Sequence, residues 1–185
     1  DAVPSTWEAL LGGWAGLVER GRERAAEAVD RLHRVNLGGT VIGDGDGAPA
    51  AYRETVVPAL CEATGDPRYE AAPDLYDAAQ NPDDAVNVSV QLGLLARGLV
   101  KIARDLRLLS SGPEGGFGEL RLPARQPGSS AMPGKVNPVI PEFVIQLALA
   151  AVGRQAACEA AIDHGELDLN VWESLTYTDE NLEAR

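Results

Sequence analysis

The chain has 185 residues, of which 45% are hydrophobic and 24% are charged, an ordinary composition for one globular domain with a core of its own. Its formal net charge of −12 argues against nucleic acid or an anionic membrane as a partner. Cys61 and Cys158 are isolated in the sequence. This spacing predicts neither a disulfide framework nor a metal site, and it favours reduced thiols and a cytoplasmic location.

The first half of the chain predicts two helices joined by a glycine-rich turn. The helix-start signal Pro4-Ser5-Thr6 precedes apolar or small residues spaced alternately by four and three, namely Trp7, Leu11, Trp14, Val18, Gly21, Ala25, Ala28 and Leu32. The glycine-rich turn at residues 38–47 ends this helix. A second helix is predicted from Ala50 to Ala63, with Pro58 as a kink and the Gly65-Asp66-Pro67 turn after it.

The second half predicts two longer helices on either side of a long loop. Asn81-Pro82-Asp83-Asp84 opens the third helix, and its apolar residues keep the same spacing through Leu92, Leu95, Leu99, Ile102, Leu106 and Leu109. Residues 110–137 hold six glycines and four prolines, which predicts a loop of a length that is often functional. A fourth helix is predicted from Pro138 to about His164, and a fifth near Val171. No strand pattern is evident, so we predict an all-α fold, an elongated bundle of about five long helices.

The fourth predicted helix is apolar on nearly every face. From Phe143 to Val152 its only strongly polar residue is Gln146. A helix of this kind has to be buried on all sides, which a small bundle cannot provide. The run is too short to span a bilayer and is flanked by Glu142 and Arg154. We therefore expect copies of this helix to be buried in an oligomer.

The loop at residues 128–138, with the sequence GSSAMPGKVNP, combines groups that suit an anionic ligand. Its backbone N–H groups could form an anion-binding concavity, and Lys135 supplies a positive charge. Asn137 supplies both a donor and an acceptor. Ser129 and Ser130 offer a nucleophile or, if strongly activated, a base. The alternative is a Ser/Gly/Pro surface loop without a function.

Other polar residues give weaker signals. Arg121 and Arg125 would extend a basic island around the loop in this acidic chain, or they are solvated surface arginines. His33 and His164 lie in helical sequence with no ligand-type neighbours, so we expect both to be structural or on the surface. We predict no metal site and no organic cofactor.

The string at residues 128–138 resembles the signature G-S-S-x-M-P-x-K-x-N-P of the fumarase/aspartase superfamily, with every specified position present. Residues 36–43 resemble the glycine-rich turn of that family, and residues 105–119 resemble the segment before its catalytic loop. The resemblance implies that residues 1–185 form the central helical domain of a longer protein. The N-terminal and C-terminal domains of the family would lie outside this chain, and four copies would form one multi-helix core.

Details of the sequence resemble the aspartase branch of the superfamily. Gly134 and Val136 flank the lysine as in aspartases and class II fumarases, and residues 137–142 and 165–173 resemble the aspartase versions of these segments. Asp44 and Asp46 depart from the neutral residues expected there. The resemblance thus implies an aspartate ammonia-lyase-like enzyme.

The resemblance also implies a reaction and roles for the loop residues. The reaction is an anti elimination of ammonia from L-aspartate, or a close amino-succinate, that gives fumarate through an aci-carboxylate intermediate. Ser129 would be the base, and Glu142 would be the acid that pairs with a histidine. The remaining residues of the site would bind substrate: Ser130, Ala131 and Met132 would face the developing oxyanion, and Lys135 and Asn137 would hold carboxylates. The alternative for Glu142 is a helix first-turn acid that interacts favourably with the helix dipole.

Two other functions stay open at this point. The first is a fumarase-type hydratase acting on malate and fumarate, and the second is a non-catalytic helical assembly module. The histidine and further hydroxyl contacts of the family would lie upstream of residue 1, so we expect this chain alone to be inactive. The expected partners are a small dicarboxylate or amino-acid substrate and other copies of the chain, as a homotetramer.

Overall fold

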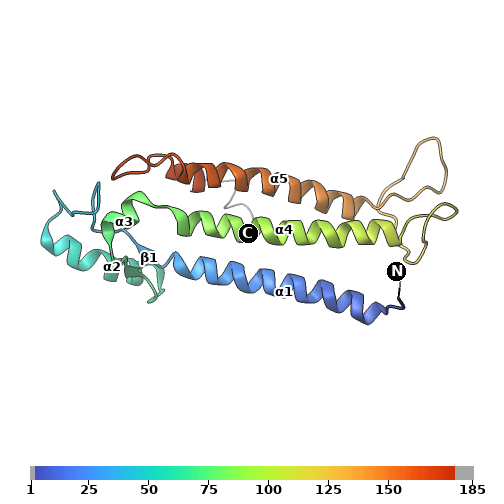
Figure 1. Cartoon of the computed structure of the whole chain (residues 1–185), viewed down its shortest axis with the longest axis horizontal. Helices are drawn as coiled ribbons and strands as arrows, with labels where there is room; N and C mark the ends of the chain where they lie inside the picture. Colours follow the sequence, from blue (N-terminus) through green and yellow to red (C-terminus); the bar gives the residue numbers. More distant parts are fainter. Residues whose placement is uncertain (1–2, 178–185) are drawn as a thin grey trace. The chain divides into compact units, whose positions relative to one another are not determined.

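A computed structural model describes residues 3–177 of the chain (Figure 1). The element order is α1 (Trp7–Arg31), β1 (Arg34–Val35), α2 (Ala50–Thr64), β2 (Glu70–Ala71), α3 (Leu75–Gln80), α4 (Asp83–Leu109), α5 (Val139–Ile162) and the 3-10 helix η1 (Glu173–Tyr177). The three longest helices, α1, α4 and α5, have 25, 27 and 24 residues. The predicted all-α class is therefore confirmed.

The helix boundaries agree with the local signals in the sequence. Thr6 caps α1, because its Oγ1 accepts a hydrogen bond from the N–H of Ala9 at 3.1 Å. The glycine Gly65, at φ 71°, ends α2 in the left-handed conformation. Acidic residues occupy the first turn of α4 and Arg107 its last turn, as the helix dipole favours.

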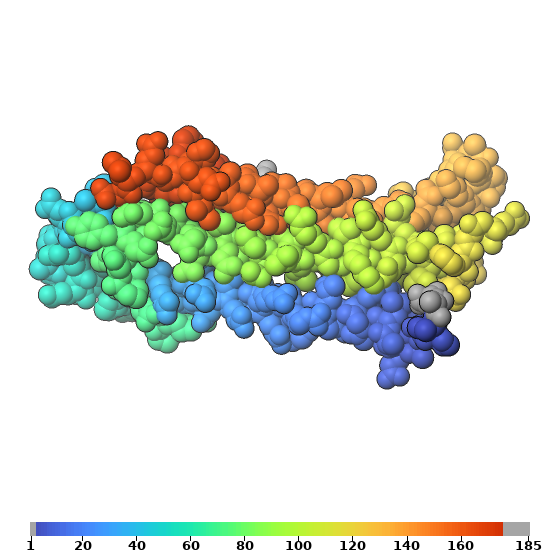
Figure 2. Space-filling view, in the orientation of Figure 1, coloured from blue at the N-terminus to red at the C-terminus, as the bar shows by residue number. Residues whose placement is uncertain are grey.

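The chain forms two compact units. Residues 1–22 and 93–153 make up the first unit, and residues 23–92 and 154–185 the second. The first unit therefore contains the start of α1, the second half of α4, the long loop and the start of α5. Within it, side chains of α4 lie between those of α1 and those of α5 (Figure 2).

Leucines from α1 and α4 pack over glycines of the opposite helix within the first unit. A Cβ on Gly21 would lie 2.6 Å from Leu95 Cδ1, and a Cβ on Gly98 would overlap the end of Leu17. Asp105 then joins the two helices through polar contacts. Its Oδ2 accepts a hydrogen bond from Trp14 Nε1 at 3.0 Å and pairs with Lys101. The predicted apolar spacing on α1 and α4 therefore corresponds to a real helix contact.

Helix α5 leaves large apolar side chains uncovered by the chain itself. Phe143, Leu147 and Leu149 are 54%, 55% and 63% exposed. Taken whole, α4 and α5 are each long and apolar enough to cross a membrane, although a core helix of a larger assembly has the same length and composition. The predicted run from Phe143 to Val152, apolar on nearly every face, lies within α5, along which polar residues form no stripe.

In the second unit, a short parallel strand pair joins the end of α1 to the segment after α2. Arg34 pairs with Glu70 and Val35 with Ala71. The His33 ring centroid lies 5.0 Å from that of Tyr69 with the rings tilted by 56°, and His33 Nε2 lies 3.3 Å from Asp66 Oδ2. The Arg68 side chain and backbone N–H both donate to Asp66, and these bonds hold the pKa of the Asp66 carboxyl well below its usual range.

Four elements differ from the prediction. The strands β1 and β2 have two residues each, which is too short for an alternating pattern in the sequence. Helix α3 has six residues and was also not predicted, although Asp74 caps it by accepting from the N–H groups of Tyr76 and Asp77. Near Val171 the structure has the five-residue helix η1 instead of a long fifth helix, and residues 178–185 lie outside the described part.

The turn at residues 38–47 lies in the second unit and brings its glycines close to α3. Gly43 and Gly45 both donate their N–H groups to the carbonyl of Gly39, at 3.0 and 2.9 Å. Gly43 has φ 96°, and a Cβ there would overlap the carbonyl group of Leu75. Gly47 has φ 76° but has nothing within 4 Å of a Cβ.

These two glycines give a matched pair of stability tests. Gly47→Ala adds only left-handed strain, so we expect it to lower the free energy of unfolding by about 1–2 kcal/mol. Gly43→Ala adds overpacking against backbone, so we expect a total loss of about 2–5 kcal/mol. Thermal unfolding followed by circular dichroism measures both. Equal losses for the two variants would show that the contact between Gly43 and Leu75 is not tight.

Candidate active site

The long loop connects α4 to α5 within the first unit, and residues 110–138 contain no helix or strand. Its first part folds back on the end of α4. The N–H of Leu120 donates to the carbonyl of Leu109 at 3.0 Å, and that of Gly118 donates to the carbonyl of Ser111 at 2.8 Å. These bonds fix where the chain leaves α4 and so limit the positions available to the segment that follows.

Residues 128–137 form a closed turn immediately before α5. The Gly128 N–H donates to the Lys135 carbonyl at 3.1 Å, and Asn137 Nδ2 donates to the Gly128 carbonyl at 2.9 Å. A Cβ on Gly128 would lie 2.7 Å from the Lys135 carbonyl carbon and closer still to its oxygen. Position 128 therefore requires glycine, because any side chain would push the backbone at residue 128 away from the backbone at Lys135.

The structure distinguishes the two serines of the turn. Ser129 is half-buried and Ser130 is exposed. Ser129 Oγ accepts a hydrogen bond from the Ala131 N–H at 3.1 Å. Ser129 is therefore the serine whose oxygen is already held by a backbone donor.

The remaining predicted binding residues lie on the exposed side of the turn. Lys135 and Met132 are exposed, and the Lys135 N–H donates to the Met132 carbonyl at 3.3 Å. Gly134 has φ 80°, which lets the chain reverse direction before the lysine. The turn thus brings the backbones of residues 128–135 together and leaves the ammonium group of Lys135 in solvent.

Glu142 lies in the first turn of α5 and faces Arg107 in the last turn of α4. Its Oε1 is 3.6 Å from Arg107 Nη2. Both histidines, His33 and His164, belong to the second unit. The sequence did not indicate Arg107 as a partner of Glu142, because nothing in the spacing of two residues 35 positions apart shows that they meet.

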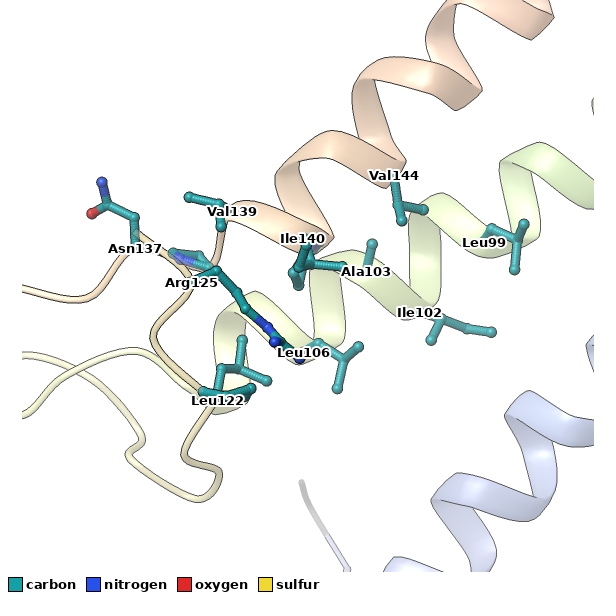
Figure 3. A pocket seen from close by; sticks show the side chains of 13 residues that line it. Leu99, Ile102, Ala103, Leu106, Leu122, Arg125, Asn137, Val139, Ile140 and Val144 are labelled. Carbon is teal, nitrogen blue, oxygen red and sulfur yellow. The ribbon is translucent and has the colours of Figure 1, made fainter. Parts of the chain in front are cut away.

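A pocket of about 350 Å³ lies beside the turn, between the end of α4 and the start of α5 (Figure 3). Its walls include Leu99, Ala103 and Leu106 of α4 and Ile140 and Val144 of α5, while Asn137 and Arg125 contribute from the loop. Arg125 therefore lies in the lining of a pocket, a position that the sequence left open. No group of three or more His, Cys, Asp or Glu residues within 3–177 is arranged to hold a metal ion.

Comparisons with known proteins agree with this arrangement. The family model described as "Lyase" (Lyase_1) matches residues 1–153. The chain is 44% identical over 173 residues to an aspartate ammonia-lyase of Helicobacter pylori strain J99, covering 94% of the chain and 37% of that protein. It is 42% identical over 171 residues to a class II fumarate hydratase of Xylella fastidiosa strain Temecula1, covering 92% of the chain and 36% of that protein.

A solved structure gives the same result at the level of the fold. A fumarate lyase:delta crystallin from Brucella melitensis superposes with a TM-score of 0.90 at 41% identity, covering 98% of this chain and 39% of the other. The chain belongs to the fumarase/aspartase superfamily. It spans 36% and 37% of the length of the two curated relatives above. In this superfamily member, the closed turn at residues 128–137 carries the whole signature string except its last residue, Pro138.

The closure of the turn by Asn137 can be tested without an activity assay. Asn137→Ala removes a hydrogen bond of about 1 kcal/mol, so backbone amides of residues 128–135 should exchange hydrogen about fivefold faster. Hydrogen exchange read by mass spectrometry measures this. Gln126→Ala, an exposed amide just outside the turn, should leave the exchange unchanged. Equal exchange in wild type and Asn137→Ala would show that Asn137 does not hold the turn closed.

Proposed function

We propose that the protein containing this chain is a carbon–nitrogen lyase that removes ammonia from L-aspartate, or from a close amino-succinate, to give fumarate. The observation that carries the proposal is the closed turn at residues 128–137, which joins a half-buried serine, backbone donors and a lysine in one short segment. Supporting evidence comes from the relatives named as aspartate ammonia-lyases.

The proposed base is Ser129, which removes the C3 proton next to a carboxylate. A free hydroxyl is too weak a base at neutral pH, so its alkoxide needs donors and a site that excludes water. The Ala131 N–H, 3.1 Å from Ser129 Oγ, is one such donor. Movement of the whole loop over bound substrate would exclude water from the site.

The electrons left by the C3 proton collect on the neighbouring carboxylate as an aci-carboxylate. Stabilising this added charge is the main task of the site. Ser130 and the Met132 N–H, together with Ala131, are proposed to face that charge. Lys135 is proposed to hold a substrate carboxylate. Asn137 is also proposed to hold a substrate carboxylate. Its carboxamide has two N–H donors, and the Gly128 carbonyl accepts from one of them, which leaves the other for the substrate.

Glu142 is proposed to pair with a histidine from the upstream part of the full-length protein. Its partner within the described residues is Arg107, at 3.6 Å. The chain alone is proposed to be inactive, because this histidine and the hydroxyl contacts expected from a preceding domain lie outside it. No metal or organic cofactor takes part in the proposed mechanism.

A second candidate is a fumarase-type hydratase, which the relative named as a class II fumarate hydratase supports. Both reactions share the aci-carboxylate and differ in the leaving group. A third candidate is a non-catalytic assembly module that keeps the signature. Incubating the full-length protein with aspartate and with malate, and measuring ammonia and fumarate, separates them. Formation of ammonia and fumarate from aspartate supports the lyase. Formation of fumarate from malate, with no product from aspartate, supports the hydratase. Absence of product from both substrates supports the assembly module.

The Ser129 assignment predicts a specific kinetic defect in the full-length protein. Ser129→Ala should lower kcat by at least about 10²–10³, the loss expected for a positioned acid–base group. Substrate binding should survive, because the lysine and the amides remain. Ser130→Ala should lose less activity, since that exposed side chain removes no proton. Steady-state kinetics decide the point, and a Ser129→Ala enzyme within threefold of wild type would contradict the assignment.

The proposed assembly is a homotetramer with α5 near its centre, and the proposed location is the cytoplasm. Exposed Phe143, Leu147 and Leu149 on α5 support burial against other copies. The small residues Ala150, Gly153, Ala157 and Ala160 would permit close approach of neighbouring helices. Cys61 is a free thiol, as a reducing compartment allows.

The assembly proposal predicts that charges on α5 break the oligomer. Phe143→Glu and Leu147→Glu would each bury an unpaired carboxylate, which is strongly unfavourable in an apolar interface. Light scattering after size exclusion should show a tetramer for wild type and smaller species for both variants. A monomeric wild-type protein at micromolar concentration would overturn the proposal.

A further inference from the structure

The pocket beside the turn has a largely apolar lining, which the proposed elimination of a dicarboxylate does not require. It has a volume of about 350 Å³, within the usual range for small-ligand sites. Of the described residues that line it, all are apolar except Arg125 and Asn137. A succinate skeleton with two carboxylates has no apolar body to fill such a space. The pocket is therefore suited to a different ligand.

Arg125 is the only charged group in the described lining. None of its nitrogens lies within 4.0 Å of a carboxylate oxygen of residues 3–177. In Figure 3 its side chain runs from the loop beside Asn137 towards Leu106 on α4. A guanidinium group against an apolar wall favours an anion that brings its own apolar surface. A planar carboxylate also matches the fork of arginine donors.

Three prolines restrict the backbone of the pocket walls, which favours a largely preformed site. They are Pro123, Pro138 and Pro141, and each has a fixed φ. Two lining residues are also fixed by burial, since Ala103 on α4 and Pro141 on α5 are buried. Preformed walls reduce the entropy lost on binding.

We propose that this pocket binds a monocarboxylate with a compact apolar body, whose carboxylate pairs with Arg125 and whose body contacts Leu106 and Ile140. One cation balances one negative charge, which favours a monocarboxylate over a phosphate dianion. The ligand would lie next to Asn137, the residue that closes the turn. The cation of this pocket is Arg125, whereas the proposed cation for the substrate is Lys135, and Asn137 borders both.

The test uses the full-length protein with benzoate as the probe and benzyl alcohol as its neutral counterpart. Isothermal titration should show saturable benzoate binding to wild type. Arg125→Gln should weaken it about tenfold or more, the scale of a lost charge-assisted pair. Arg125→Lys should weaken it less, because it keeps the charge but loses the fork. Benzyl alcohol should bind wild type and Arg125→Gln equally and more weakly than benzoate.

Arg121→Gln is the matched control, since Arg121 is an exposed arginine of the same loop that does not line the pocket. It should leave benzoate binding unchanged. Equal weakening by Arg121→Gln and Arg125→Gln would show a diffuse charge effect and overturn the proposal. Absence of saturable benzoate binding to the assembled protein would also overturn it. Succinate binding should be the same in wild type and Arg125→Gln, so the result is independent of the proposed elimination.

Discussion

The hydrogen bond from Asn137 Nδ2 to the Gly128 carbonyl, 2.9 Å long, is the contact on which the site geometry depends. With the Gly128–Lys135 backbone bond beside it, this contact closes the turn immediately before α5 begins. Every signature side chain is then attached to a short segment whose two ends are fixed. The conformational entropy of the turn is therefore lost when the protein folds, and less of it remains to be lost when substrate binds.

The helices on either side of the loop extend this constraint. Arg107 lies in the last turn of α4 and Glu142 in the first turn of α5, so each charge lies at the helix end where the dipole favours it. Their contact at 3.6 Å joins the two helices across the ends of the loop. The same Glu142 is the proposed partner of an upstream histidine. Because one carboxylate can accept from both, binding of the histidine need not break the link between the helices.

The sequence predicted most of the fold because its helices carry redundant signals. Helix α4 has acidic residues at its start, repeated leucines along one face and a glycine-rich loop after it, and these signals agree on where the helix begins, which face it buries and where it ends. Helix α3 and the two strands lack this redundancy, since a six-residue helix has fewer than two full turns and a two-residue strand is too short to show repeated alternation. The turn at residues 38–47 was predicted from its glycines, but its contact with Leu75 depends on the missed α3.

The candidate site shows a different limit. The signature string identified Ser129, Lys135 and Asn137 by type, but hydrogen-bond partners are set by the dihedral angles of a turn that has no periodicity. Sequence alone thus did not show that one donor of Asn137 is used inside the turn. It also did not show that the Ala131 N–H points at Ser129 Oγ. An N–H that stabilises the Ser129 oxygen is not free to face the substrate carboxylate in the same state.

The Ala131 N–H is thus needed as a donor both to Ser129 Oγ and to the substrate carboxylate. These two roles imply an order of events in the proposed mechanism. Before proton transfer, the negative charge would lie on Ser129, where the Ala131 donor is needed. After transfer, the serine is a neutral hydroxyl and the charge lies on the substrate, where the same N–H becomes useful. A donor that follows the charge over a small distance would serve both states without reorganising the closed end of the turn. The bonds at Gly128 leave residues 129–134 as the part of the segment that is able to make this adjustment.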